Sequence, residues 1–348
     1  MYLAGIKYKK KMRLRILLSI AVFASVMLFS CSKDNNSTVV IRDKAEQYAT
    51  DIAAIDEFID THYMEVDPLT YDVDFVEIPE NGTQQSIREQ TQYPLKDTLI
   101  TQDDVDYKVY FLKFREGTQK RPTQVDSVHV AYKGINLDLS VFDEAPVANW
   151  FTLETVITGW AHMIPNFKSG TYTNVPGQPL QYDNYGAGVV FLPSGLGYFN
   201  GSSTNISPYS PLIFSFKLIE VQYKDHDRDK IFSKDERSFP LTNWSDNPKD
   251  FDSDGDDKAN YVDVDDDGDG FLTRNELLYT VNGTNYYYPF NGALVDDPST
   301  PNVDERRGIP RKYTGPVVNG VATPVDEDFT ANPRLRRHLD PTATPVNP

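Results

Sequence analysis

Residues 151–160 read Phe-Thr-Leu-Glu-Thr-Val-Ile-Thr-Gly-Trp, and residues 157–167 are a candidate for a short helix. The segments around this stretch are rich in Val, Tyr, Phe and Ile, which is typical of β-strands. Several strands with one short helix predict the α+β class, in which an antiparallel sheet carries the helix on one face. The expected strands are residues 107–114, 127–132, 188–192 and 212–222.

Four more short motifs accompany this stretch in a fixed order. Residues 128–134 read Val-His-Val-Ala-Tyr-Lys-Gly, and residues 141–143 read Val-Phe-Asp. Residues 193–198 read Pro-Ser-Gly-Leu-Gly-Tyr, and residues 206–214 read Ile-Ser-Pro-Tyr-Ser-Pro-Leu-Ile-Phe. With all five motifs, residues 121–223 resemble the FKBP-type peptidyl-prolyl isomerases over the whole of their domain. The resemblance implies an antiparallel sheet wrapped on a short helix, and an enzyme whose partners are proline-containing polypeptide clients.

The same resemblance implies an apolar pocket that receives the proline of a client. Trp160 would form the floor, Tyr198 would offer its hydroxyl, and the backbone N–H of Ile157 would donate a hydrogen bond to the bound peptide. Core packing is the alternative explanation for each aromatic residue taken singly, and a surface turn is the alternative for Asp143. The positions that match the family's site are Tyr132, Phe142, Asp143, Phe151, Val156, Ile157, Trp160, Tyr198, Ile206 and Phe214.

Prolyl isomerisation suits such a pocket because the reaction breaks no covalent bond. Its barrier is the loss of amide resonance, about 18–20 kcal/mol, and a twisted amide is less polar than a planar one. The chain has five scattered histidines and neither a Gly-x-Ser-x-Gly nor a His-Glu-x-x-His motif, so we expect no cofactor in catalysis. The alternative function is a binding module that holds peptides in the same pocket without turnover, in a secretion, motility or surface assembly.

Three features depart from the family pattern, at the expected rim of the pocket. The connection at residues 170–189 is longer than usual, Phe199 stands where the family has glycine, and Ser207 stands where it often has proline. We expect these changes to affect the range of substrates more than the fold.

The first thirty residues have the pattern of a bacterial signal peptide. Six basic residues precede an uncharged apolar run over residues 16–29, which is shorter than the roughly 20 residues of a transmembrane helix. Residues 28–31, Leu-Phe-Ser-Cys, resemble a lipobox, and Cys31 is the only cysteine. We therefore expect an acylated Cys31 that binds a lipid bilayer in the cell envelope, as in a lipoprotein branch of the family in Bacteroidota. A core thiol or an uncleaved anchor is the alternative.

Charge restricts the partners of the mature chain. Without the six basic residues of the signal peptide it has 28 Lys plus Arg against 51 Asp plus Glu. Such an excess of negative charge repels nucleic acid and anionic head groups, so no nucleic-acid partner is expected. Cations are the expected ionic partners.

The expected organisation has six parts. Apolar residues recur at spacings of three and four over residues 43–62, which predicts an amphipathic helix that packs or dimerises. Residues 64–104 are polar and should be irregular, with one strand at residues 71–78. The parts are a signal peptide (1–30), a tether (31–42), the helix with an irregular or strand region (43–120), the isomerase domain (121–223), an acidic segment (224–282) and a Pro-rich tail (283–348).

The acidic segment contains a complete calcium-loop pattern at residues 265–276. A hard cation such as Ca²⁺ takes 6 to 8 oxygen ligands, and the loop supplies them at fixed positions around a glycine at position 6. Asp265, Asp267 and Asp269 occupy positions 1, 3 and 5, Phe271 occupies position 7 and Glu276 position 12. We expect calcium here in a structural role, and a solvated acidic linker is the alternative.

Two more stretches repeat the pattern incompletely. In the first, Lys230 replaces the glycine and adds a positive charge, so that occupied and unoccupied sites are equally consistent with the sequence. The second is closer to aspartate-rich repeats of the thrombospondin type than to a paired EF-hand. The expected ligands are Asp225, Asp227, Asp229 and Glu236 in the first stretch, and Asp252, Asp254, Asp256 and Asp263 in the second.

Overall fold

The computed structural model describes residues 41–202, 205–237, 247–292 and 294–345. The expected signal peptide, Cys31 and all but the last two residues of the expected tether lie outside the described residues. The chain divides into residues 1–41 and 42–348, and the description below concerns the second unit. Within the described ranges, no helix has the length and apolar character that crossing a bilayer requires.

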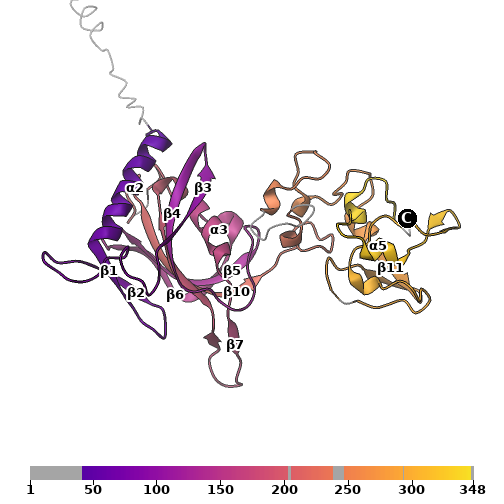
Figure 1. Ribbon diagram of the computed structural model, residues 1–348, viewed down its shortest axis with the longest axis horizontal. Coiled ribbons are helices and arrows are strands. Elements are labelled where there is room, and N and C mark those ends of the chain that lie inside the picture. Colours follow the sequence, from indigo (N-terminus) through magenta and orange to yellow (C-terminus); the bar gives the residue numbers. More distant parts are fainter. Residues whose placement is uncertain (1–40, 203–204, 238–246, 293, 346–348) are drawn as a thin grey trace, which may run out of the picture. The chain divides into compact units, whose positions relative to one another are not determined.

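A six-stranded sheet forms the centre of the fold, in the order β3-β4-β9-β10-β5-β6, and every neighbouring pair is antiparallel (Figure 1). The four expected strands are present as β4, β5, β9 and β10, whereas β3 and β6 were not predicted. Because β3 and β4 precede residue 121, the sheet starts earlier than the domain boundary expected there. The strands are β3 (Lys96–Gln102), β4 (Val105–Arg115), β9 (Gly186–Leu192), β10 (Leu212–Gln222), β5 (Ser127–Asn136) and β6 (Val141–Thr152).

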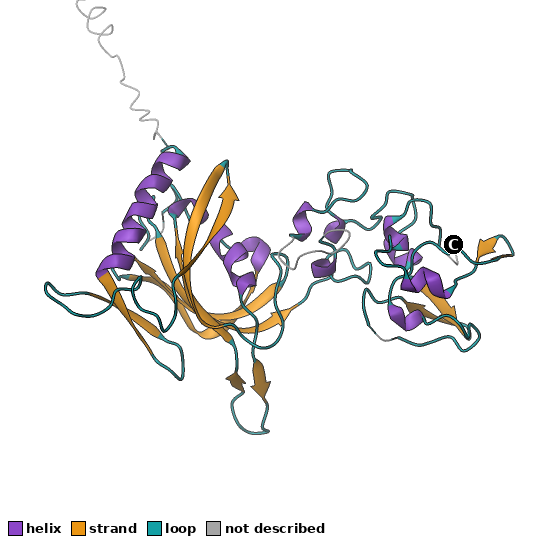
Figure 2. Ribbon diagram, viewed as in Figure 1, coloured by secondary structure: helices purple, strands orange, loops and turns teal. Residues whose placement is uncertain are grey.

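Helices cover both faces of this sheet (Figure 2). Side chains alternate between the faces of a strand, so Val109 and Phe111 of β4 join one apolar cluster while Tyr110 and Leu112 join the other. The first cluster includes α3 (Thr158–Met163), which continues into a 3₁₀ turn, η3 (Ile164–Asn166). The expected antiparallel sheet with a short helix on one face is thus present.

The predicted N-terminal helix is α2 (Lys44–Thr61), and it packs on the second face. Asp43 caps it, because its carboxylate accepts hydrogen bonds from two backbone N–H groups of the first turn at 2.9 and 3.0 Å. Its C-terminal half is buried against the sheet through Ile55, Phe58 and Ile59. Ala45 and Ala49 of the predicted apolar pattern are exposed.

Residues 64–104 contain more strand than the sequence predicted. β1 (His62–Val66) and β2 (Val73–Glu77) form an antiparallel hairpin, and β3 follows. The long connection at residues 170–189 contains a second hairpin, β7 (Thr171–Thr173) and β8 (Gln181–Asp183). Short 3₁₀ turns occur at η2 (Leu153–Thr155) and η4 (Ser194–Leu196).

The outer strand β6 is interrupted by a bulge. Residues 146–148 lie opposite the single residue Ala131 of β5, and the bulge contains Pro146. The His129 ring nitrogen Nε2 lies 2.9 Å from the carbonyl oxygen of Ala148, so this freed backbone group has a side-chain partner.

The expected acidic segment (224–282) and the expected Pro-rich tail (283–348) pack together. Ile231 and Leu277 of the acidic segment share one apolar cluster with Tyr288, Ile309 and Phe329 of the tail. The regular elements of these two segments are η5 (Ser233–Asp235), η6 (Pro248–Asp250), η7 (Asn260–Val262), α4 (Thr273–Glu276), β11 (Leu278–Val281), β12 (Thr284–Tyr287), η8 (Glu305–Arg307), β13 (Val317–Val318), β14 (Val321–Ala322), α5 (Asp326–Thr330) and η9 (Arg337–Leu339).

Candidate functional site

The predicted site residues come together in an aromatic cluster on the α3 face of the sheet. Trp160 of α3 is 4% exposed, and three rings from β5, β6 and β10 meet it edge-on. Its ring centroid lies 5.0 Å from that of Tyr132, 5.7 Å from Phe151 and 5.3 Å from Phe214. Such edge-to-face contacts are favourable for aromatic rings. Trp160 is therefore held rigidly at the base of the cluster, and its indole Nε1 has no hydrogen-bond partner among the described residues.

Gly134 allows two rings to approach the sheet at the same place. Phe142 meets Phe214 at a centroid distance of 5.3 Å and an interplanar angle of 85°. A Cβ on Gly134 would lie 2.5 Å from the Cζ atom of Phe142 and 3.0 Å from the Cε1 atom of Phe214. Only glycine fits this position without moving a ring of the cluster.

One edge of the cluster is polar. The Tyr132 hydroxyl donates to the Asp143 carboxylate at 2.6 Å, and burial followed by this hydrogen bond raises the pKa of Tyr132. Tyr198 is 48% exposed, and burial followed by the charge of Asp143 raises its pKa. The Tyr198 hydroxyl therefore stays protonated at neutral pH and can donate a hydrogen bond.

The remaining predicted residues line the same cluster. Ile206 is buried in it, while Val156 and Ile157 are partly buried against it. The Ile157 carbonyl accepts hydrogen bonds from the N–H groups of Trp160 and Ala161, whereas the Ile157 N–H has no acceptor within the described part of the chain. This free donor next to Trp160 is where the resemblance placed a contact with the substrate. A cavity of about 420 Å³ adjoins Ile206 and includes Ser207.

Phe199, which stands where the family pattern has glycine, keeps a glycine-like backbone and packs its ring on a neighbouring residue. Its φ is +47°, in the left-handed region where glycine is favoured, and its ring packs edge-on against Tyr209 at 5.1 Å. The hairpin in the long 170–189 connection contacts β5 through Tyr182, whose ring lies 6.2 Å from that of His129.

Asp51 is a site-positioning residue that sequence reasoning missed. Its buried carboxylate accepts the Ser194 backbone N–H at 2.7 Å and the Ser194 hydroxyl at 2.6 Å, and Gln47 donates to it at 2.6 Å. Burial raises its pKa above the ordinary value, and the Ser194 hydroxyl is the largest opposing effect. Helix α2 is thereby bound to the turn that leads into Tyr198. The sequence offered one signal for this role: Asp51 precedes Ile55 by one helical turn, so it lies on the apolar face of the predicted helix.

The three acidic loops share one backbone form. In each loop the residues at positions 4 and 6 have positive φ, between +66° and +91°. In each, the side chain at position 9 accepts the N–H of position 2, at 3.3, 2.9 and 3.0 Å respectively. The position 4 and 6 residues are Arg228 and Lys230, Gly255 and Asp257, and Gly268 and Gly270.

Lys230 does not place its charge in the first loop's site. It adopts φ +91°, the same value as Gly270, and its Nζ lies 5.7 Å from the centroid of the Tyr287 ring. Lys230 thus adopts the backbone conformation that glycine usually provides at position 6 of the calcium-loop pattern. This conformation is strained for a residue with a side chain.

Carboxylates at positions 1, 3 and 5 converge in every loop. Ligand atoms lie within 4.8 Å of one another in the groups Asp225, Asp227, Asp229; Asp252, Asp254, Asp256; and Asp265, Asp267, Asp269. Position 12 differs between the loops. Glu276 is buried with both carboxylate oxygens unpartnered, whereas the Asp263 carboxylate pairs with Lys258 at 2.9 Å. Among the described residues, neither side chain belongs to the group formed by positions 1, 3 and 5 of its own loop.

Burial and mutual repulsion shift these carboxyl groups strongly. Burial, followed by the charge of Asp225, raises the pKa of Asp227 to about 7. Burial and the charge of Asp227 raise the pKa of Asp229 to about 8, and burial and Asp267 raise that of Glu276 to about 9. Glu276 has an opposing cation, Arg337. Burial and neighbouring negative charges disfavour the ionised form of these carboxyl groups, and a bound cation would favour it again. These carboxylates are therefore candidate metal ligands.

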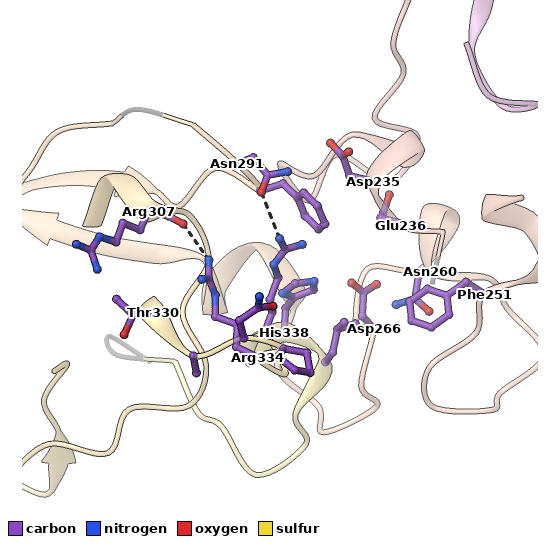
Figure 3. A pocket seen from close by; sticks show the side chains of 16 residues that line it. Asp235, Glu236, Phe251, Asn260, Asp266, Asn291, Arg307, Thr330, Arg334 and His338 are labelled. Atoms are coloured by element: carbon purple, nitrogen blue, oxygen red, sulfur yellow. Dashed lines mark hydrogen bonds between the residues drawn. The ribbon is translucent and has the colours of Figure 1, made fainter. Parts of the chain in front are cut away.

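A cavity of about 350 Å³ adjoins this acidic region (Figure 3). Glu236 and Asp266 line it together with Arg334 and His338 of the tail. Arg334 donates from Nη2 to the Arg307 carbonyl at 2.9 Å, so its guanidinium is held by the backbone.

Comparison with known proteins gives partial matches. A family model described as BamM C-terminal matches residues 226–302. A probable FKBP-type peptidyl-prolyl cis-trans isomerase FkpA of Neisseria meningitidis serogroup B is 30% identical over 127 residues, 35% of this chain and 39% of that protein. A probable FKBP-type 25 kDa peptidyl-prolyl cis-trans isomerase of Pseudomonas aeruginosa is 31% identical over 93 residues, 26% of this chain and 34% of that protein.

Two solved structures also match in part. A peptidyl-prolyl cis-trans isomerase from Pseudomonas syringae has a TM-score of 0.28 at 27% identity, covering 33% of this chain and 75% of that one. FkpA from Escherichia coli has a TM-score of 0.28 at 25% identity, covering 36% and 51%. The chain spans about two fifths or less of the length of the two curated relatives. These relatives are FKBP-type peptidyl-prolyl isomerases, which supports that family for the matched part of this chain.

Proposed function

We propose that this chain is a peptidyl-prolyl cis-trans isomerase that acts on proline-containing polypeptides in the cell envelope. The observation that carries the proposal is the aromatic cluster around Trp160, with the unpaired N–H of Ile157 and the half-exposed hydroxyl of Tyr198 beside it. The curated relatives support the enzyme class.

The geometry suits the chemistry of amide rotation. A proline ring set against Trp160 would leave water, and the less polar twisted amide would be favoured over the planar ground state in such surroundings. The Ile157 N–H would hold a neighbouring carbonyl of the peptide, and Tyr198 would donate to a second polar group. Neither step requires a nucleophile or a cofactor.

A protease-coupled assay with a proline tetrapeptide tests this function. We expect the full chain to catalyse turnover and to be inhibited by the macrolides that bind the family. Tyr198→Phe should lower kcat/KM several-fold, since one hydrogen bond contributes about 0.5–1.5 kcal/mol. The matched control is Tyr63→Phe on strand β1, which does not belong to the cluster around Trp160 and should leave kcat/KM unchanged.

The same assay separates the alternative. If the protein binds a proline peptide or macrolide with no turnover, it is a peptide-binding module in a surface or secretion assembly. Absence of both binding and turnover would mean that the aromatic cluster is only a core.

Cys31 is proposed as the lipid attachment site, because it alone joins the apolar run to a polar segment. Metabolic labelling with palmitate should mark the wild type. Equal labelling of Cys31→Ala would contradict the anchor.

The C-terminal region is proposed to bind calcium for structural stability. The convergent carboxylates at positions 1, 3 and 5 of three loops support this, as do the unpartnered oxygens of Glu236 and Glu276. Calcium should leave turnover nearly unchanged, since the cluster around Trp160 contributes no predicted ligand.

A further inference from the structure

Asp266 is a buried carboxylate whose side chain has no partner. It occupies position 2 of the loop at residues 265–276, which is not one of the liganding positions of the pattern. It is 2% exposed, and neither carboxylate oxygen has a hydrogen-bond partner among the described residues. Its backbone is satisfied, because its N–H donates to Thr273 Oγ1 at 3.0 Å and its carbonyl accepts from the Ser253 hydroxyl. Its position is therefore fixed while its charge is left uncompensated.

The Asp266 side chain reaches the site of a different loop. Its ligand oxygen and those of Asp227 and Glu236 all lie within 4.8 Å of one another. Figure 3 shows Glu236 and Asp266 on separate segments of the chain. Glu236 is 4% exposed with both carboxylate oxygens unpartnered among the described residues, and Asp229 is 2% exposed with one oxygen unpartnered.

Such a group of carboxylates needs a cation. An unpaired buried charge is strongly unfavourable, and three of them at this spacing repel one another. In the part of the chain that the structure describes, no lysine or arginine forms an ion pair with Asp227, Glu236 or Asp266. A divalent cation with a preference for oxygen ligands would remove the repulsion and satisfy the free oxygens.

We propose that Asp266 is a ligand of the cation bound by the loop at residues 225–236, so that one ion joins this loop to the loop at residues 265–276. This inference rests on the proposed calcium binding of the region. With Asp225, Asp227, Asp229 and Glu236, it gives the first site five carboxylates. A fifth carboxylate should tighten binding at this site, since calcium affinity rises with the number of charged ligands.

Calcium titration of the full chain by calorimetry tests this assignment. Asp266→Asn should weaken one site by about tenfold or more, an effect expected for losing a carboxylate ligand. Asp257→Asn is the matched control, because Asp257 is an exposed carboxylate of the same region that belongs to none of the convergent groups, and asparagine tolerates its φ of +71°. The control should bind like the wild type.

Double variants show to which site Asp266 belongs. Asp266→Asn combined with Glu236→Gln should lose no more than one site, because both changes act on the same ion. Asp266→Asn combined with Glu276→Gln should weaken two sites. The reverse pattern, non-additive with Glu276 and additive with Glu236, would overturn the inference while leaving calcium binding intact.

Two further outcomes are decisive. In EGTA, Asp266→Asn should unfold at the wild-type temperature or above, since the change removes repulsion without a cation present. A lower unfolding temperature in EGTA with unchanged calcium affinity would make Asp266 merely structural and contradict the inference. If the wild type binds no calcium at millimolar concentration, the proposed calcium binding itself fails.

Discussion

Gly134 controls the site because two rings lie directly against its Cα. We expect Gly134→Ala to displace Phe142, to destabilise the protein by about 1–3 kcal/mol as overpacking does, and to lower kcat/KM. Chemical denaturation and the coupled assay measure the two effects. In a Phe142→Ala background the destabilisation should largely disappear, because the nearest clashing atoms are gone. A full additional loss in that background would show that Phe142 is not the cause.

Single residues were predictable where a motif fixed them. The order of five motifs predicted Tyr132, Phe142, Phe151, Trp160 and Phe214, and the structure brings their rings together. Asp51 and Asp266 were not predicted, because the contact of each depends on a segment distant in sequence. Asp51 meets Ser194, 143 residues away, and no local spacing encodes that distance.

Helix α2 acts on the site through its contact with the turn before Tyr198. Asp51→Ala should leave the Ser194 N–H and hydroxyl buried without an acceptor, which costs about 1–3 kcal/mol for each such group. The control on the same helix is Asp56→Ala, which removes a surface ion pair with Arg88 and should cost at most about 1 kcal/mol.

The free energy of unfolding and the kinetic constants of both variants test this role. Asp51→Ala should raise KM more than it lowers kcat if α2 positions Tyr198, and Asp51→Asn should recover part of the loss because it keeps an acceptor. Equal stability of Asp51→Ala and Asp56→Ala would contradict the argument.

Helix α2 and the long strands of the sheet were predicted well, because their apolar patterns extend over many residues. The short hairpins, which are defined mainly by a two-residue turn, were not predicted. β11 and β12 are joined by Asn282-Gly283, and β13 and β14 by Asn319-Gly320, each pair with positive φ. These dipeptides favour tight hairpin turns. The boundary expected at residue 282 falls inside the first hairpin, and the second hairpin lies within the expected Pro-rich tail.

The whole molecule should respond to pH in opposite directions with and without calcium. In chelator, Asp227, Asp229 and Glu276 have folded pKa values of about 7, about 8 and about 9, above their ordinary values of 3.8, 3.8 and 4.5. Raised values mean that the folded state binds more protons than the unfolded state. Stability is therefore fully present below the ordinary values and is lost as pH rises through 7 to 9.

Calcium should reverse this slope, because it binds the deprotonated carboxylates of the folded form. Thermal unfolding at pH 5, 7 and 9, in EGTA and in millimolar calcium, measures both slopes, with turnover at pH 7 as the control that should not change. Stability in EGTA that rises from pH 5 to 9 would rule out the repulsive carboxylate cluster.

For the molecule as a whole, the packing of the C-terminal tail was the feature that the sequence predicted least well. Residues 283–348 are too poor in apolar residues to fold alone, but they supply Tyr288, Ile309 and Phe329 to a cluster begun by Ile231. Local composition describes the acidic segment and the tail separately, whereas the apolar cluster forms only when the two segments pack together.

The bulge in β6 has a consequence for how copies of this protein behave when crowded. An open sheet edge is a template on which a second chain can add strands and begin to aggregate. Val147 and Trp150 make this edge apolar and exposed, which would favour such growth. Pro146 lacks the N–H that an incoming strand must pair with, and the extra residues bend the strand away from a straight register. The bulge and its proline thus protect the apolar part of this edge against self-templating, next to the exposed carboxylates of Asp143 and Glu144 on the same strand.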